Sequence, residues 1–288
     1  MWCLIYNTYT CVKKISINKG NWMEHTIGCT TRPYASISFA EACEHIAEAG
    51  YSDVAVFGNT GSVAISSNSS RQDVENARRV AEKVGLVPSL LIGGTQLNLG
   101  LEAAVEDYRR LIGNTASLGA SWLLDCGTSN TAHYDDYYAL MQETSPYAEA
   151  CGITITLKPH GGITLTVQDL INAYNRVNRS GFGICYDPGN IIYYTKGEHQ
   201  PDTNLDLLAP KISNLIIKDC ILDNGNPDVM VTPGEGLVDF GEVIAILQKA
   251  GFQGPMYLEC VGGESLDEIN HNVKSTLDFL RNLTVENQ

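Results

Sequence analysis

Residues 153–174, ITITLKPHGGITLTVQDLINAY, contain a complete strand–loop–helix unit. Residues 153–157 alternate isoleucine and threonine and end in leucine, which is typical of a strand. Thr166 and Asp169 have the spacing of a helix-capping pair. Apolar residues then recur at helical intervals, at Val167, Leu170, Ile171 and Tyr174. The stretch therefore predicts a strand that leads into a helix.

The same unit recurs along the chain in both directions. Eight strands are expected, at residues 25–30, 53–58, 86–94, 121–127, 153–158, 182–187, 212–219 and 255–261. Helical patterns separate them, and capping pairs such as Ser38–Glu41, Asp239–Glu242 and Ser265–Glu268 open several of these. Eight such units without a linker predict a single-domain α/β fold, the (β/α)8 TIM barrel.

Two irregularities are expected within this pattern. Ser145-Pro146 fits a cap followed by a first-turn proline, so we expect the helical region after the fourth strand to break there. After the sixth strand we expect a loop with only a short helix near residues 205–208. Residues 1–22 precede the first strand and are expected to be an extension outside the fold, which leaves the barrel in residues 23–288.

Composition restricts the class of protein. The apolar segment near the start precedes its three lysines, the wrong order for a signal peptide, and is too short for a membrane span. Nine cysteines without CxxC spacing favour reduced, mostly buried thiols and a cytoplasmic protein. A net charge of −14 without a basic stripe argues against a nucleic-acid partner. Homo-oligomers are common, but the sequence does not indicate one.

Polar residues gather at the predicted carboxyl ends of the strands, where barrel enzymes place their chemistry. In strand order they are Arg32, Asp125, Lys158 with His160, Asp187 with Asn190, Lys218 with Asp219, and Glu259. Any one of these charges alone is more simply explained as a structural ion pair. Because neighbouring strands deliver them to one rim, a functional site is expected there.

Four segments carry a family resemblance: GITITLKPHGG (152–162), GICYDPGNIIYY (183–194), NLIIKDC (214–220) and VTPGEGLVDFGEVIAILQKAGFQGPMYLE (231–259). They resemble motifs of the sugar phosphate isomerase/epimerase family, which has a xylose isomerase-like TIM barrel. The resemblance extends from about residue 25 to about residue 282. It implies a divalent metal held by glutamate, aspartate, histidine and glutamate on strands five to eight.

This chain departs from that ligand set at two positions. Asp187 and Glu259 match, but Lys158 stands at the strand-five glutamate and Ile216 at the histidine. An ammonium has no lone pair and an isoleucine cannot ligate. We therefore predict no metal, with the Lys158 ammonium in its place between the two carboxylates. The alternative is a Mn, Mg or Zn site through His160, Asp187 and Glu259.

The resemblance implies a carbohydrate isomerase or epimerase, or a related lyase, that acts on a sugar or sugar phosphate by proton transfer beside a carbonyl. Lys158 and Glu259 are the expected catalytic residues, and they should face one another across a pocket. Substrate contacts are expected from Arg32, His160, Asp187, Asn190, Lys218 and Glu235. The alternative for Glu235 is a glycine turn. The alternative for the whole chain is an inactive sugar-binding or regulatory subunit, paired with an oxidoreductase or an active paralogue.

Overall fold

A computed structural model describes residues 25–63 and 65–286, so the predicted extension at residues 1–22 lies outside the described residues. Eight parallel strands close into a barrel, in the order β1-β2-β5-β6-β7-β8-β9-β12. They are β1 (Ile27–Thr30), β2 (Asp53–Val56), β5 (Val87–Ile92), β6 (Trp122–Asp125), β7 (Thr154–Leu157), β8 (Phe182–Tyr186), β9 (Ile212–Ile217) and β12 (Met256–Leu258). The predicted α/β barrel and all eight of its strands are confirmed.

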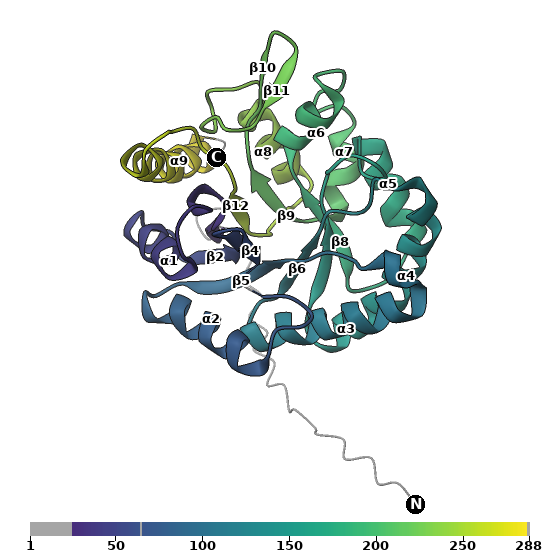
Figure 1. Ribbon diagram of the computed structural model, residues 1–288. Coiled ribbons are helices and arrows are strands. Elements are labelled where there is room, and N and C mark those ends of the chain that lie inside the picture. The colour runs from purple at the N-terminus through teal and green to yellow at the C-terminus, as the bar shows by residue number, and fades with distance from the viewer. Residues whose placement is uncertain (1–24, 64, 287–288) are drawn as a thin grey trace, which may run out of the picture.

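Helices surround the barrel on its outside (Figure 1). They are α1 (Phe39–Glu48), α2 (Arg71–Lys83), α3 (Leu101–Leu118), α4 (Tyr134–Ala150), α5 (Val167–Val177), α6 (Pro188–Thr195), α7 (Leu205–Leu208), α8 (Phe240–Lys249) and α9 (Leu266–Glu286). Capping is as predicted at α1 and α5. In α1 the side chain of Ser38 accepts the backbone N–H of Glu41, and the side chain of Glu41 accepts the backbone N–H of Ser38. Thr166 and Asp169 form the same pair of bonds at the start of α5. These reciprocal bonds satisfy donors that a helix start leaves free.

Two short hairpins interrupt the βα pattern. β3 (Gly58–Asn59) pairs with β4 (Ser62–Val63), and β10 (Ile221–Asp223) pairs with β11 (Asn226–Asp228). The second hairpin extends from the barrel after β9 (Figure 1). Its turn is Asn224-Gly225, both at positive φ (50° and 82°), the conformation that a two-residue hairpin turn requires.

The predicted break at Ser145-Pro146 is wrong, because α4 runs through both residues. A proline inside a helix removes one backbone donor, which normally weakens the helix. Here the hydroxyls of Thr144 and Ser145 donate to the carbonyls of Leu140 and Met141, and both residues are buried, whereas Pro146 itself lies on the exposed face. Packing and these side-chain bonds therefore keep the helix continuous.

The expectation of only a short helix near 205–208 is also wrong in part. The short helix α7 is present at Leu205–Leu208, but α6 precedes it directly after β8. Asp187 caps α6 by accepting the N–H of Asn190 at 3.0 Å, and Pro188 is its first residue. An aspartate followed by a proline is a recognised signal for a helix start. The helix was not expected from the sequence because it is short and contains a glycine.

The core has two parts. A large apolar layer fills the space between strands and helices. A smaller cluster lies inside the barrel and contains Ala55, Phe57, Leu90, Leu124, Cys185, Ile216 and Tyr257. Cys29, Cys185, Cys220 and Cys260 are buried, as expected of structural thiols, and Cys126 is partly buried. Among the described helices none is both long and apolar enough to cross a lipid bilayer.

Candidate active site at the barrel mouth

Four consecutive strands of the barrel each end in a charged residue at the same place. Lys158 follows β7, Asp187 follows β8, Lys218 is one residue beyond β9, and Glu259 follows β12. Lys158 Nζ lies 2.9 Å from Asp187 Oδ2 and also contacts Glu259 Oε2. Lys218 Nζ lies 3.2 Å from Asp187 Oδ2 and also contacts Glu259 Oε1. Two ammonium groups thus bridge two carboxylates, and we call these four residues the ionic quartet.

The quartet is buried and its charges balance. Side-chain exposure is 2% for Lys158, 0% for Asp187, 5% for Lys218 and 8% for Glu259. Ions at this depth are tolerated only when they are paired and hydrogen-bonded. The small exposure of Lys218 and Glu259 leaves an edge that a ligand could reach.

The charges hold one another in the ionised state. Burial alone would lower the pKa of Lys158, but the carboxylates of Glu259 and Asp187 raise that pKa well above its ordinary value. Burial alone would raise the pKa of Glu259, but the ammonium groups of Lys158 and Lys218 lower it to about 2. At neutral pH Lys158 is therefore a cation and Glu259 an anion.

Asn190 connects the quartet to its surroundings. Its Oδ1 accepts a bond of 3.2 Å from Lys218 Nζ, and its Nδ2 donates to the carbonyl of Pro159 at 2.7 Å. Its backbone N–H donates to Asp187 Oδ1. The cap of α6 and the quartet therefore share Asp187, which fixes this helix relative to the strand ends.

The structure thus brings together Lys158, Asp187, Asn190, Lys218 and Glu259 from the predicted set. The prediction that Lys158 and Glu259 face one another across a pocket differs from the geometry. The two side chains meet directly at the mouth, and neither enters the helix layer nor bulk solvent. An ammonium and a carboxylate on adjacent buried strand ends are more stable in contact than separated.

The other predicted residues lie around the rim. His160 is exposed, and its ring packs on Tyr194 with centroids 4.9 Å apart. Arg32 is exposed in a short turn after β1, and its guanidinium makes no hydrogen bond or ion pair with the described residues. Neither Arg32 nor Glu235 is hydrogen-bonded or ion-paired to the quartet.

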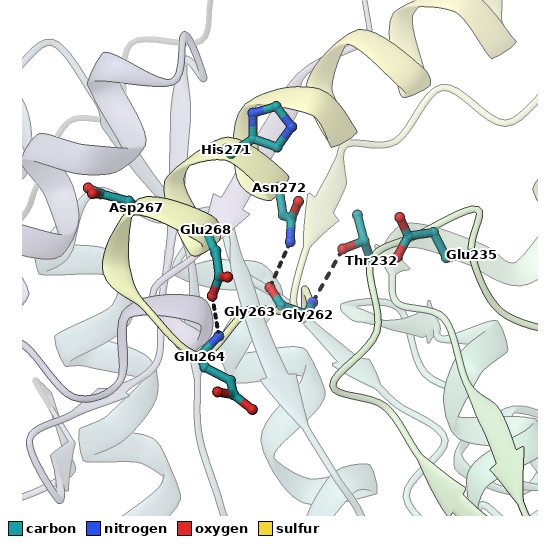
Figure 2. A pocket seen from close by; sticks show the side chains of 9 residues that line it. All are labelled: Thr232, Glu235, Gly262, Gly263, Glu264, Asp267, Glu268, His271 and Asn272. Carbon is teal, nitrogen blue, oxygen red and sulfur yellow. Dashed lines mark hydrogen bonds between the residues drawn. The ribbon is translucent and has the colours of Figure 1, made fainter.

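Glu235 lies beside a cavity of about 540 Å³ between the loop before α8 and the start of α9 (Figure 2). The residues that line it are Thr232, Glu235, Gly262, Gly263, Glu264, Asp267, Glu268, His271 and Asn272. Thr232 Oγ1 accepts the N–H of Gly262, and Asn272 Nδ2 donates to its carbonyl, as Figure 2 shows. The first bond joins the loops that follow β9 and β12, and the second holds the loop after β12 to α9.

Asp219 holds the loop that carries Glu235. Its buried carboxylate accepts backbone N–H bonds from Cys220, Gly234, Gly236 and Val238, at 2.8 to 3.0 Å. Gly234 has φ +95°, and a Cβ on Gly236 would lie 2.3 Å from Asp219 Oδ1. The glycines flanking Glu235 therefore have a structural reason, as the turn interpretation expects. The sequence placed Asp219 at a strand end but gave no sign of this role.

Asp125, the remaining strand-end carboxylate, is separate from the quartet. It accepts bonds from Tyr137 Oη (2.8 Å), Tyr108 Oη (3.1 Å) and the N–H of Gly127 (2.8 Å). Burial raises its pKa to about 6, which these donors only partly offset. Asp125 thus joins the end of β6 to helices α3 and α4.

A divalent metal bound by the ligand set that the resemblance implies does not fit these residues. Ile216 packs in the apolar cluster inside the barrel and offers no ligand atom. Lys158 contributes a cation at the position of a ligand, and its ammonium contacts both remaining carboxylates. Each of those carboxylates is already neutralised by ammonium groups.

The chain is similar in sequence to a family model and to two curated proteins. The family model described as xylose isomerase-like TIM barrel matches residues 43–283. Inosose dehydratases from Yersinia enterocolitica and Serratia proteamaculans are each 24% identical in an alignment of 132 residues. The alignment covers 41% of this chain. The match spans 44% of the length of these relatives.

Solved structures share the fold at lower identity. A xylose isomerase-like TIM barrel protein from Mycobacterium smegmatis in complex with magnesium is 17% identical, with a TM-score of 0.72, over 92% of this chain and 100% of the other. A D-psicose 3-epimerase with D-tagatose from Clostridium cellulolyticum H10 is 14% identical, with a TM-score of 0.72, over 90% and 99%. At such identities the likeness shows the fold alone.

Proposed function

This chain belongs to the xylose isomerase-like TIM barrel family, and from that premise we propose that it is an enzyme that isomerises or epimerises a sugar by moving a proton beside its carbonyl group. One observation carries the proposal: two buried ammonium groups and two carboxylates meet at the barrel mouth. Barrel enzymes place their reacting groups at this end of the strands.

Lys158 supplies the electrophile in this proposal. An ammonium has three N–H donors. The ammonium of Lys158 donates to Glu259 and lies 2.9 Å from Asp187 Oδ2 as an ion pair. Among the described residues it has no further hydrogen-bond acceptor, so a donor remains for the carbonyl oxygen of a substrate. When the neighbouring carbon loses its proton, the C–H electron pair forms the C=C bond of an enediolate, and negative charge moves to that oxygen. An adjacent fixed cation stabilises this charge.

Glu259 is the proposed proton acceptor. With both ammonium groups in contact its pKa is about 2, so it is a weak base. If the substrate oxygen draws Lys158 away from Glu259 Oε2, the cause of that low pKa is partly removed and the carboxylate becomes more basic. It then gives this proton to the former carbonyl carbon, while the hydroxyl proton on the carbon that was deprotonated passes to the former carbonyl oxygen, which gives an isomer. Epimerisation instead requires that the deprotonated carbon receive a proton on its opposite face.

The reaction is proposed to need no metal, because Lys158 and Lys218 together carry the charge of a divalent ion. The rival arrangement, a Mn, Mg or Zn ion on His160, Asp187 and Glu259, requires Lys158 to leave both carboxylates. Metal analysis of the wild type beside a Lys158→Glu/Ile216→His variant separates the two. Metal-free wild type with a variant that binds one ion supports the lysine account, and stoichiometric metal in the wild type overturns it.

Catalysis itself is tested by exchange of carbon-bound hydrogen. D-fructose, D-psicose, D-tagatose and an inosose are incubated with the protein in D2O and EDTA, and deuterium beside the carbonyl is followed by NMR. We expect exchange with at least one sugar, reduced about 100-fold or more in Lys158→Met and Glu259→Gln. Lys249→Met, an exposed lysine at the end of α8, is the control. Absence of exchange with every probe, or full exchange in both variants, contradicts the proposal.

A second candidate is an inactive sugar-binding or regulatory subunit. It is favoured by the completeness of the quartet, in which both Glu259 oxygens are occupied by ammonium groups. Such a closed network also stabilises a barrel that has lost its chemistry. Sugar binding without any hydrogen exchange would support this candidate.

A further inference from the structure

We propose that His160 and Tyr194 form the binding wall of this site, and that its ligand is an uncharged polyhydroxylated carbonyl compound and not a sugar phosphate. The inference rests on the proposed function, because it takes the quartet as the reacting centre. It assigns Tyr194, which neither the motifs nor the comparisons single out.

Tyr194 is placed at the mouth by the helix that carries it. It lies four residues after Asn190 on α6, and residues at that spacing share one helix face. Asn190 bonds both Lys218 and the carbonyl of Pro159, so this face lies over the segment after β7. Farther along, the Tyr194 ring lies against Gly161, where an added Cβ would be 3.0 Å from the ring.

The loop that presents His160 is firmly held. The backbone N–H of His160 donates to Thr164 Oγ1 at 2.9 Å. A Cβ on Gly162, at φ +56°, would lie 2.3 Å from the carbonyl of Thr128. The His160 and Tyr194 rings meet at an angle of 49°. The wall is therefore preformed, which reduces the entropy that binding must overcome.

The polar ends of both rings are available. Among the described residues neither the His160 ring nitrogens nor the Tyr194 hydroxyl has a hydrogen-bond partner. A neutral imidazole ring offers one donor and one acceptor. Hydroxyl groups of a polyol both donate and accept, and their carbon-bound hydrogens can pack on an aromatic face.

Charge around the mouth disfavours a phosphate. The two ammonium groups of the quartet are balanced by two carboxylates, which leaves no excess cation for a dianion. The neighbouring cavity is lined by four acidic residues and by neither lysine nor arginine (Figure 2). The chain as a whole carries −14. Arg32 is the exposed cation at a strand end, and it is the rival anchor for a phosphorylated sugar.

The test is binding by calorimetry to the full chain at low salt. The uncharged probes are D-fructose, D-psicose, D-tagatose and an inosose, and the charged probe is D-fructose 6-phosphate. We expect at least one uncharged probe to bind at least tenfold more tightly than the phosphate. Tyr194→Ala should weaken that binding about tenfold or more and Tyr194→Phe less, because the ring face remains.

Tyr147→Ala, at an exposed tyrosine on α4, is the matched control, and far-ultraviolet circular dichroism confirms folding of each variant. Tighter binding of the phosphate, lost in Arg32→Gln, overturns the inference. So does unchanged binding in Tyr194→Ala, or no binding of any uncharged probe. Binding that depends on Tyr194 without hydrogen exchange refutes the proposed catalysis and leaves the assignment of the wall intact.

Discussion

Replacing Lys158 by methionine should destabilise the protein strongly, although it removes a single charge from a buried position. Methionine fills most of the lysine's length, so the change is chiefly electrostatic. It leaves Asp187 and Glu259 with only Lys218 between them. Breaking a buried ion pair by removing one partner typically costs about 3–5 kcal/mol, because the other charge stays buried.

The structure gives an independent measure of this loss. The pKa of Glu259 falls from 4.5 to about 2 through its contacts with Lys158 and Lys218. A difference of about 2.5 in pKa, at about 1.4 kcal/mol for each pKa unit, corresponds to about 3–4 kcal/mol for the two ammonium groups together. A lowered carboxylate pKa contributes stability above pH 4.5 that is lost as the pH falls through 2. The full contribution is therefore present at pH 7.5, and replacing Lys158 removes one of the two ammonium groups that produce it.

The assay is urea unfolding at pH 7.5 of the wild type, Lys158→Met, Glu259→Gln and the double variant. The double variant retains one cation and one anion, Lys218 and Asp187, so charge balance is restored. We expect Lys158→Met to lose about 3–5 kcal/mol. The double variant should recover about 2 kcal/mol relative to the summed single losses. A loss below about 1 kcal/mol, or strict additivity of the single changes, would refute the quartet as a coupled unit.

Three further predictions concern the residues that hold the mouth. The pKa of Asp125 is raised to about 6, so this carboxyl contributes stability below pH 3.8 that is lost as the pH rises through 6. In urea unfolding, the free energy of unfolding of the wild type should therefore gain up to about 3 kcal/mol relative to Asp125→Asn when the pH is lowered from 8 to 4. Asp219→Ala leaves four backbone donors unpaired and should cost at least about 3 kcal/mol, with new proteolytic cleavage within residues 229–238; unchanged cleavage contradicts this. Gly162 has φ +56°, and Gly162→Ala places a Cβ 2.3 Å from the carbonyl oxygen of Thr128, so it should lower the melting temperature. Gly152 has φ +76° and open space around it, so Gly152→Ala tests the backbone strain without the steric clash.

The barrel was predictable because its signals are local. Alternation in a strand and capping pairs at helix starts depend on residues within a few positions of one another, and β7 with α5 shows both. The break at Pro146 was predicted wrongly because the outcome depends on tertiary packing around α4, which a local signal does not contain. α6 was missed although its Asp187-Pro188 start is itself a local signal.

The residues that form the site were predictable in part, but the ion pairs between them were not. Sequence order places Lys158, Asp187, Lys218 and Glu259 at strand ends, but it does not state that both lysines share both carboxylates. That sharing depends on strand register and on side-chain length. Tyr194 was not predicted, because its position follows from α6, which the sequence interpretation omitted.

Ile216 stands where the family resemblance implies a histidine ligand, and this has a physical consequence for the lysines above it. Ile216 is two residues before Lys218, so both side chains lie on the inner face of the strand. The same spacing relates Cys185 to Asp187 and Tyr257 to Glu259, and all three lower residues belong to the cluster inside the barrel. Asp187, Lys218 and Glu259 therefore lie above this apolar cluster, whereas the residue two positions before Lys158 is the buried Thr156. A histidine at position 216 would bring a polar ring beneath the Lys218 ammonium, whereas isoleucine keeps that position apolar and strengthens the ion pairs above it. On this argument Ile216 favours an ion-paired lysine at the mouth, because it offers neither a metal ligand nor a polar group that competes for the ammonium.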